Sequence, residues 1–250
     1  MSAHLDAERA PYLDLTRFVP APTLDELDAY LLAHNIGCET PPNGVAPTAF
    51  FADDQKHATA YELCDKDASH WEPAPRDEEE AFAMCRRRRG CERTWRPNAN
   101  GEALPGVADF LARLPVFSST GKVAILVNEP GTRGVEHVDH RLPDLVSEMI
   151  WIRPAWSRKE FYIKDLCLRK HVVPRDVRVL FFDDHLPHGI HAVDGDGQVS
   201  LRVDGVFRPL FRAFVSRFGY FSDVDGGGSL AAVLRAQAPE GDEAADGGES

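Results

Sequence analysis

The chain has 250 residues, of which 43% are hydrophobic, so it can bury a sizeable core and form one large domain or two small ones. Forty acidic residues against 28 basic ones give a formal net charge of −12, which disfavours sequence-independent binding to a phosphate backbone, so no nucleic acid is expected as a partner. No apolar run approaches the roughly 18 residues of a membrane span, and no secretory signal is recognised at the start of the sequence. We therefore expect no membrane partner and a cytoplasmic location.

The five cysteines are odd in number, widely scattered and without a CxxC pair. This usage argues against both a disulfide framework and a zinc ribbon. The sequence gives no indication of the oligomeric state.

The N-terminal half of the chain has the pattern of helices and loops. Over residues 21–35, four leucines fall close to one helical face and Thr23 with Glu26 fits a capping box, so the pattern predicts a helix that packs on the core. A second helix is predicted over 75–90, where acidic residues begin the segment and four arginines end it. The helix dipole explains these arginines, and a grip on an anionic substrate is the less favoured alternative. A third helix is predicted over 106–114.

From residue 121 onward the sequence changes to short β-rich runs separated by turns. Their spacing predicts a compact sandwich or barrel rather than βαβ units. The predicted division is a helical and loop region over 1–120 that packs on the core, a β core over 121–222, and a short helix with a disordered acidic tail over 223–250. The predicted strands lie within residues 122–128, 148–154, 159–165, 177–184, 188–193, 199–207 and 211–221.

The segment GVEHVDHRLPDL, residues 134–145, places His137, Asp139 and His140 within four positions. Side chains two apart on a strand point to the same side, so His137 and Asp139 can direct an imidazole and a carboxylate at one point. A proline and glycines at the start of this region argue against the helix that the HExxH motif of zinc proteases requires. Alone, the triplet is a weak signal, because ordinary polar residues on a strand explain it as well.

A second stretch, VRVLFFDDHLPHGIHAV, supplies His185, His188 and His191. Their spacing of three would suit one face of a helix, but the proline and glycine between them oppose a helix. On a strand, His188 and His191 point to opposite faces, so only one of them can join the H-x-D pair. Two histidines and one carboxylate make the facial triad that leaves metal positions open and is diagnostic of non-heme Fe(II) oxygenases. The remaining histidines are expected to lie at the surface or to support the ligands.

Two motifs together carry a resemblance to a known family. The first is KVAILVNEPGTRGVEHVDH, and the second is FFDDHLPHGIHAV followed by VSLRVDGVFRP. Over about residues 121–210 the chain resembles the Fe(II)/2-oxoglutarate-dependent oxygenases, and the second motif is similar to that of the aspartyl/asparaginyl β-hydroxylase branch. That branch often lacks the carboxylate ligand, whereas Asp139 is present here. The resemblance implies that His137, Asp139 and His188 are the metal ligands.

The resemblance also implies the fold, the cofactors and the reaction. The fold would be mainly β, a double-stranded β-helix (jelly roll) with the N-terminal helices packed on it and Fe(II) at its mouth. 2-Oxoglutarate and O2 would be cosubstrates, and conversion of 2-oxoglutarate to succinate would be coupled to hydroxylation. The substrate would be an amino acid, a peptidyl residue or a small natural product.

The far carboxylate of 2-oxoglutarate needs a basic partner, and here the sequence departs from the family. Where many members have an arginine, about ten residues after the distal histidine, this chain has Gln198. Arg202 shares a strand face with Gln198 and Ser200 by the two-residue period, so Arg202 is predicted to make the salt bridge. Arg153 and Lys164, on neighbouring predicted strands, are the further candidates for the cosubstrate pocket.

Two other classes of function stay open from the sequence alone. A jelly-roll protein that binds a metal or another ligand without oxidising anything would keep the same barrel. A zinc hydrolase would use a similar set of donors. Succinate release that depends on iron and 2-oxoglutarate separates the oxygenase from both alternatives.

Overall fold

The computed structural model describes residues 10–37, 45–47, 49–53, 56–64, 95–134, 136–139 and 148–217. Within these ranges the chain forms antiparallel strands and a few helices. The strands are β1 (Tyr12–Asp14), β2 (Ala49–Asp53), β3 (Lys56–Glu62), β4 (Phe117–Asn128), β5 (Met149–Ile152), β6 (Phe161–Lys164), β7 (Lys170–Val172), β8 (Val179–Phe182), β9 (His188–Ile190) and β10 (Gln198–Phe207). The helices are the 3-10 helix η1 (Thr16–Phe18), α1 (Ala21–Ala33), α3 (Ala99–Ala103), α4 (Pro105–Ala112) and α5 (Pro209–Ser216).

The strands form two sheets whose connections define a double-stranded β-helix. In the described part of the chain, the larger sheet has the order β1-β8-β5-β10-β4-β3-β2 and the smaller one the order β7-β6-β9. A single bridge between His137 and His188 adds the segment after β4 to the edge of the smaller sheet, beside β9. From β4 to β10 the chain therefore passes back and forth between the two sheets, which is the path of a jelly roll. The predicted mainly β jelly-roll fold is confirmed.

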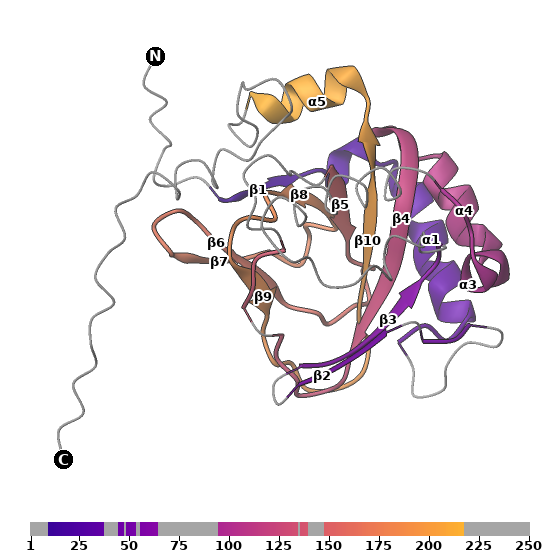
Figure 1. Cartoon of the computed structure of the whole chain (residues 1–250), viewed down its shortest axis with the longest axis horizontal. Helices are drawn as coiled ribbons and strands as arrows, with labels where there is room; N and C mark the ends of the chain where they lie inside the picture. The colour runs from indigo at the N-terminus through magenta and orange to yellow at the C-terminus, as the bar shows by residue number, and fades with distance from the viewer. Residues whose placement is uncertain are drawn as a thin grey trace, which may run out of the picture.

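The two sides of the larger sheet bury different kinds of side chain, as β10 illustrates. Val199, Leu201 and Val203 are fully buried and belong to the larger hydrophobic core, which also contains the apolar faces of α1 and α4. Figure 1 shows these helices on one side of β4 and β10, with the smaller sheet on the other. The alternate residues of β10, from Ser200 to Asp204, point between the sheets. There they lie beside a second, smaller apolar cluster that includes Trp151 of β5.

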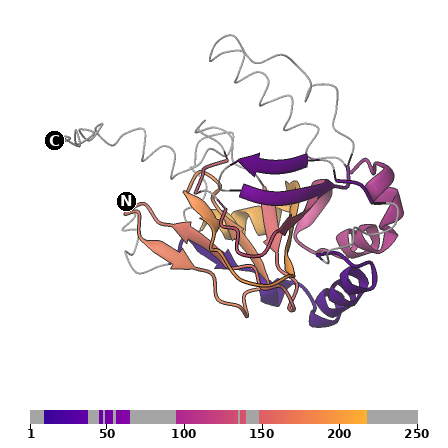
Figure 2. The same ribbon diagram turned by 90° about the horizontal axis from the view of Figure 1, so that it is seen from below.

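The region before residue 121 contributes more to the sheet than its sequence suggested. It was expected to supply helices and loops, but β1 lies at one edge of the larger sheet, and β3 and β2 extend the other edge (Figure 2). The predicted boundary at residue 120 also falls inside β4. A strand as short as β1, with three residues, is too short to show the alternation that identifies a strand in a sequence.

The helix predicted over 21–35 is present, but its predicted cap is wrong. The helix begins at Ala21 after Pro20, and Thr23 lies buried in its first turn rather than at the N-cap. Proline is tolerated in a first turn, where the missing N–H would have no acceptor within the helix. Pro20 and Pro22 therefore set the start of α1. The helix predicted over 106–114 is confirmed by α4.

The strand predicted over 211–221 is wrong in its described part, because residues 211–216 belong to the helix α5, and residues 218–221 lie outside the described residues. Pro209 occupies the first turn, and the buried residues Phe211 and Val215 are four apart, which is helical spacing. The predictions for 75–90 and 223–250 lie outside the described residues. None of the helices within the described ranges is both long and apolar enough to cross a bilayer.

Two neighbouring leucines of α1 test how the helix packs. Leu31 is fully buried, whereas Leu32 is 48% exposed. We expect Leu31→Ala to lower the free energy of unfolding by about 2–5 kcal/mol, because it leaves a cavity in the larger core, and Leu32→Ala to change it by about 0.5 kcal/mol or less. Urea denaturation followed by circular dichroism measures both. Equal losses would contradict the packing of α1 described above.

Candidate metal centre

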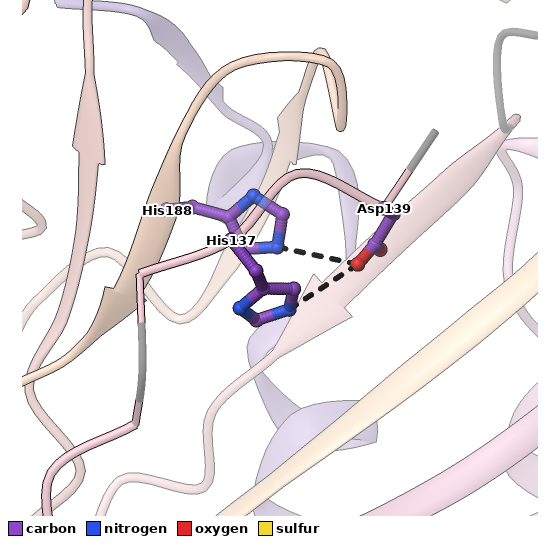
Figure 3. A group of neighbouring side chains, drawn as sticks. All are labelled: His137, Asp139 and His188. Atoms are coloured by element: carbon purple, nitrogen blue, oxygen red, sulfur yellow. Dashed lines mark ion pairs between the residues drawn. The ribbon is translucent and has the colours of Figure 1, made fainter. Parts of the chain in front are cut away.

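Main-chain hydrogen bonds bring the two histidine motifs together. The His137 N–H donates to the carbonyl of His188 at 3.0 Å, and the His188 N–H donates to the carbonyl of His137 at 2.9 Å. Two residues further on, the Asp139 N–H donates to the carbonyl of Asp184 at 3.0 Å. Three side chains predicted as ligands, those of His137, Asp139 and His188, therefore point toward one another (Figure 3).

The donor atoms of these three residues are spaced as a facial triad needs. The Nε2 atoms of His137 and His188 lie 3.3 and 3.6 Å from Oδ1 of Asp139. One donor atom from each residue lies within 4.8 Å of both others. Two donors that bind one metal ion at right angles, each about 2.1 Å from it, would be about 3 Å apart. The set fits a divalent ion after a small inward movement.

The protonation of the triad also suits a metal. Nδ1 of His188 lies 2.9 Å from the carbonyl oxygen of Leu186, which can only accept, so Nδ1 carries a proton and Nε2 is the ring nitrogen left for a metal ion. Burial alone would raise the pKa of the Asp139 carboxyl, but the charge of Arg202 and hydrogen bonds from the two histidines outweigh burial and hold that pKa well below its usual value. Asp139 is therefore an anion.

Glycine allows the two motifs to approach so closely. A Cβ atom at Gly189 would lie 2.8 Å from the hydroxyl of Tyr162 and 3.2 Å from the carbonyl oxygen of Gly134. A Cβ atom at Gly134 would lie 2.6 Å from a side-chain carbon of Ile190. A larger residue at Gly134 would collide with Ile190 of β9, and one at Gly189 would crowd Tyr162 and the carbonyl of Gly134.

The sequence Phe182-Asp183-Asp184 leads into a turn that supports the segment of His137 and Asp139. Oδ1 of Asp183 accepts hydrogen bonds from the backbone N–H and the Nδ1 of His185, both at 3.0 Å. His185 is buried in this turn, while the carbonyl of Asp184 holds the backbone of Asp139. Asp183, Asp184 and His185 also bring possible ligand atoms together, but these internal bonds already account for the cluster.

His191 lies on the opposite side of the chain from His188. His191 has its ring 4.9 Å from that of Tyr162 and its Nδ1 3.7 Å from Glu160, away from the triad. His188 instead lies against Phe161 and Phe182 of the inner cluster. The two histidines thus face opposite sides, as the strand pattern predicted. His140 lies outside the described residues.

Lys164 and Arg153, two of the residues predicted for the cosubstrate pocket, have other partners. Lys164 lies on the same strand face as Tyr162, and its Nζ is 2.7 Å from Oε1 of Glu136. The guanidinium of the buried Arg153 donates to the main-chain carbonyls of Lys159, Pro174 and Val177. These contacts bind Arg153 into the loops around it and give it a structural role.

Gln198 closes the connection between β9 and β10. Its side-chain amide donates to the carbonyls of Glu129 at 3.1 Å and of Val193 at 2.8 Å. These bonds tie the start of β10 to the ends of two neighbouring segments.

Arg202, the residue predicted to bind the far carboxylate, lies against the triad itself. It makes an ion pair with Oδ2 of Asp139, and its Nε lies 3.0 Å from Oδ2 of Asp204. Its Nη2 is also 3.7 Å from Oδ2 of Asp184. Burial lowers the pKa of the Arg202 guanidinium, but the carboxylates of Asp204 and Asp139 outweigh burial and raise that pKa well above its ordinary value.

A buried lysine that the sequence argument missed lies between the sheets. Lys159 is only 4% exposed, and its Nζ donates to the hydroxyl of Ser200 at 2.7 Å. Among the residues that the structure describes, no carboxylate lies within ion-pair distance of this ammonium group. Burial lowers the pKa of Lys159 from its ordinary value of 10.5 to about 7. The signal in the sequence was the alternation of Lys159 with Phe161 and Ile163, which both point between the sheets.

No family model matches the chain, and no curated protein is similar to it in sequence. Three solved structures are similar in fold. The first is a prolyl-4-hydroxylase of Pseudomonas putida, with 12% sequence identity and a TM-score of 0.42 over 80% of this chain and 92% of that one. The second is a prolyl hydroxylase of Trichoplax adhaerens in complex with a peptide fragment of the hypoxia inducible factor oxygen degradation domain, with 12% identity and a TM-score of 0.44 over 81% of this chain and 85% of that one. The third is a 2OG-Fe(II) oxygenase family oxidoreductase of Burkholderia pseudomallei, with 11% identity and a TM-score of 0.44 over 77% of this chain and 82% of that one. These similarities are loose, and the fold assignment rests on the strand order given above.

The predicted ligands can be tested against a histidine on the opposite face. We expect His137→Ala, Asp139→Ala and His188→Ala each to lose at least about tenfold in affinity for Fe(II), because each removes one of three donors, while His191→Ala keeps its affinity. Anaerobic equilibrium dialysis with Fe(II) measures this. Normal binding by His188→Ala, with loss in His191→Ala, would overturn the ligand set.

The buried lysine makes stability depend on pH. Between about pH 7 and 10.5 the unfolded chain holds one more proton at Lys159 than the folded chain does, so the free energy of unfolding should rise with pH by up to about 1.4 kcal/mol per unit. Below about pH 7 the lysine is charged in both states, and this contribution is flat and fully destabilising. Lys159→Met should therefore be more stable than the wild type near pH 7, with the difference shrinking toward pH 10.

Urea denaturation of both proteins at several pH values, without metal or 2-oxoglutarate, gives that difference. Other titrating groups are common to the two proteins and cancel. A difference that does not change with pH would show that Lys159 keeps its ordinary pKa in the folded protein.

Proposed function

We propose that the chain is an Fe(II)- and 2-oxoglutarate-dependent oxygenase that hydroxylates an amino acid, a peptidyl residue or a small natural product. One observation carries the proposal. A two-histidine, one-carboxylate set and a buried lysine without a carboxylate partner among the described residues lie on the same inner side of a double-stranded β-helix.

The triad fits Fe(II) in the identity, the spacing and the protonation of its donors. We assign Nε2 of His137, Oδ1 of Asp139 and Nε2 of His188 as the ligands. Bound Fe(II) would supply the activation of O2, with conversion of 2-oxoglutarate to succinate and carbon dioxide coupled to hydroxylation of the substrate. Three protein ligands leave positions for 2-oxoglutarate and O2.

We further assign Lys159 and Ser200 to the far carboxylate of 2-oxoglutarate. A buried ammonium group is costly unless an anion is placed beside it, and a dicarboxylate provides one. Ser200 and Arg202 are two residues apart on β10, about 7 Å along a strand, and Arg202 contacts Asp139. This distance is comparable to the length of 2-oxoglutarate. The assignment replaces the sequence-based expectation for Arg202, whose guanidinium is already engaged by three carboxylates.

The two histidines differ in how they meet solvent, which supports a direction for substrate entry. His188 is buried against the rings of Phe161 and Phe182, which keep water from the inner side of the site. The side chain of His137 is 41% exposed. We propose that the substrate approaches from the side of His137.

The proposal is tested by turnover with defined components. We expect protein reconstituted with Fe(II), ascorbate and 2-oxoglutarate to release succinate, and a screen of free amino acids, short peptides and small metabolites to find compounds that stimulate this release. Retention of zinc after anaerobic purification, with hydrolysis and no succinate, would favour a zinc hydrolase. Metal binding without either activity would favour a binding protein.

The cosubstrate assignment is tested with two matched lysine variants. We expect Lys159→Met to raise the Michaelis constant for 2-oxoglutarate by roughly ten- to a hundredfold, the scale of a lost charge-assisted hydrogen bond. Lys164→Met removes a lysine from the outer side of the smaller sheet and should leave this constant unchanged. Initial rates of succinate formation over a range of 2-oxoglutarate concentrations give the Michaelis constant of each variant. An unaltered constant in Lys159→Met would reject the assignment.

A further inference from the structure

The position of Arg202 points to a role toward the metal ligand rather than toward the cosubstrate. Resting on the proposed function, we infer that Arg202 is a positioning residue that holds one oxygen of Asp139, so that this carboxylate binds the metal through its other oxygen alone.

The two carboxylate oxygens of Asp139 have different surroundings. Oδ2 accepts a hydrogen bond from Nη1 of Arg202. Oδ1 is the atom that faces Nε2 of His137 at 3.3 Å and Nε2 of His188 at 3.6 Å. The guanidinium thus occupies one oxygen and leaves the other on the side of the histidines.

Arg202 can hold this oxygen in place because it is itself fixed. Its Nε and Nη2 both donate to the carboxylate of Asp204, over distances of 3.0 to 3.2 Å. Asp204 is 4% exposed and stands two residues along the same strand, on the same face. Nη2 also approaches Asp184, whose carbonyl oxygen holds the backbone N–H of Asp139. The backbone and the side chain of Asp139 are therefore fixed by the same group of residues.

The arrangement depends on the shape of the guanidinium and not on its charge alone. A planar guanidinium presents several N–H donors in fixed directions and can engage Asp139 and Asp204 together. A lysine would place the same positive charge nearby, but its ammonium group is compact and sits on a flexible side chain, so it does not present donors in fixed directions. Without the bond to Oδ2, the Asp139 carboxylate can rotate, and both of its oxygens become available to a metal ion.

The decisive variant is therefore Arg202→Lys, which keeps the net charge of the site. We expect its affinity for Co(II), a spectroscopic substitute for Fe(II), to fall about ten- to a hundredfold, which is typical when a partner of a metal ligand is changed. The visible absorption of the bound Co(II) should change as well, because it reports the number and arrangement of the ligands. The dissociation constant for 2-oxoglutarate, titrated into the Co(II)-loaded protein, should stay within about threefold of the wild-type value.

Lys159→Met is the reciprocal control and should show the reverse pattern, with normal Co(II) affinity and spectrum but weakened 2-oxoglutarate binding. Asp204→Asn keeps both Arg202 and Asp139 and loosens only the hold on the guanidinium. It should shift the Co(II) spectrum in the same direction as Arg202→Lys, to a smaller extent. This second variant decides the question if Arg202→Lys does not fold.

The outcomes separate this inference from the proposed function. Wild-type Co(II) affinity and spectrum in Arg202→Lys would overturn the inference, and so would a loss confined to 2-oxoglutarate, which would make Arg202 the cosubstrate anchor. If the wild-type protein binds no Co(II), or if 2-oxoglutarate does not perturb the bound Co(II), the proposed function fails whatever Arg202 does.

Discussion

The paired main chains of His137 and His188 are the contact on which the rest of the site depends. The two reciprocal hydrogen bonds join segments that are far apart in the sequence. They fix the main-chain positions from which both imidazoles extend, and they do so without a metal ion. Gly134 and Gly189 favour this pairing, because an added Cβ atom at Gly134 would collide with Ile190 and one at Gly189 would crowd Tyr162 and the carbonyl of Gly134. The carbonyl of Asp184 then holds Asp139 in the same way. The site is thus positioned mainly by backbone groups, which have little freedom once the sheets have formed.

The structure separates stability from chemistry by placing them on opposite sides of the larger sheet. The outer side, under α1 and α4, is almost entirely apolar and supplies most of the buried hydrophobic area. The inner side carries several buried polar and charged groups, including Lys159, Asp184 and Asp204. Buried ions are costly unless they are paired, and here most of them belong to one connected group around Arg202. The apolar outer core offsets the cost of a polar interior that the proposed chemistry requires.

The spacing of the short β-rich runs was sufficient to predict a sandwich or barrel, and the resemblance to the oxygenase family implied the jelly roll and His188 as the third ligand. The two-residue period of a strand supplied the rest of the predicted ligand set. That period placed His137 and Asp139 together and separated His188 from His191. It did not predict what Arg202 contacts, because Asp139 comes from a segment 63 residues away in the chain. Lys159 was missed because its position just before β6 resembled an exposed strand end. The segment of α5 was predicted as one more β-rich run, although its buried residues Phe211 and Val215 are four apart, which is helical spacing.

The alternation along β10 also restricts how this strand can pair during folding. A slip of one residue against β4 and β5 would turn Ser200, Arg202 and Asp204 into the apolar core under α1 and α4, and would bring Val199, Leu201 and Val203 between the sheets. Arg202 and Asp204 would still face each other, but they would be buried among apolar side chains and Arg202 would lose Asp139 and Asp184. Each polar residue on the inner face therefore disfavours misaligned pairings of the strand. Variants that make this face apolar to raise stability would weaken the discrimination between the native register and its nearest competitors.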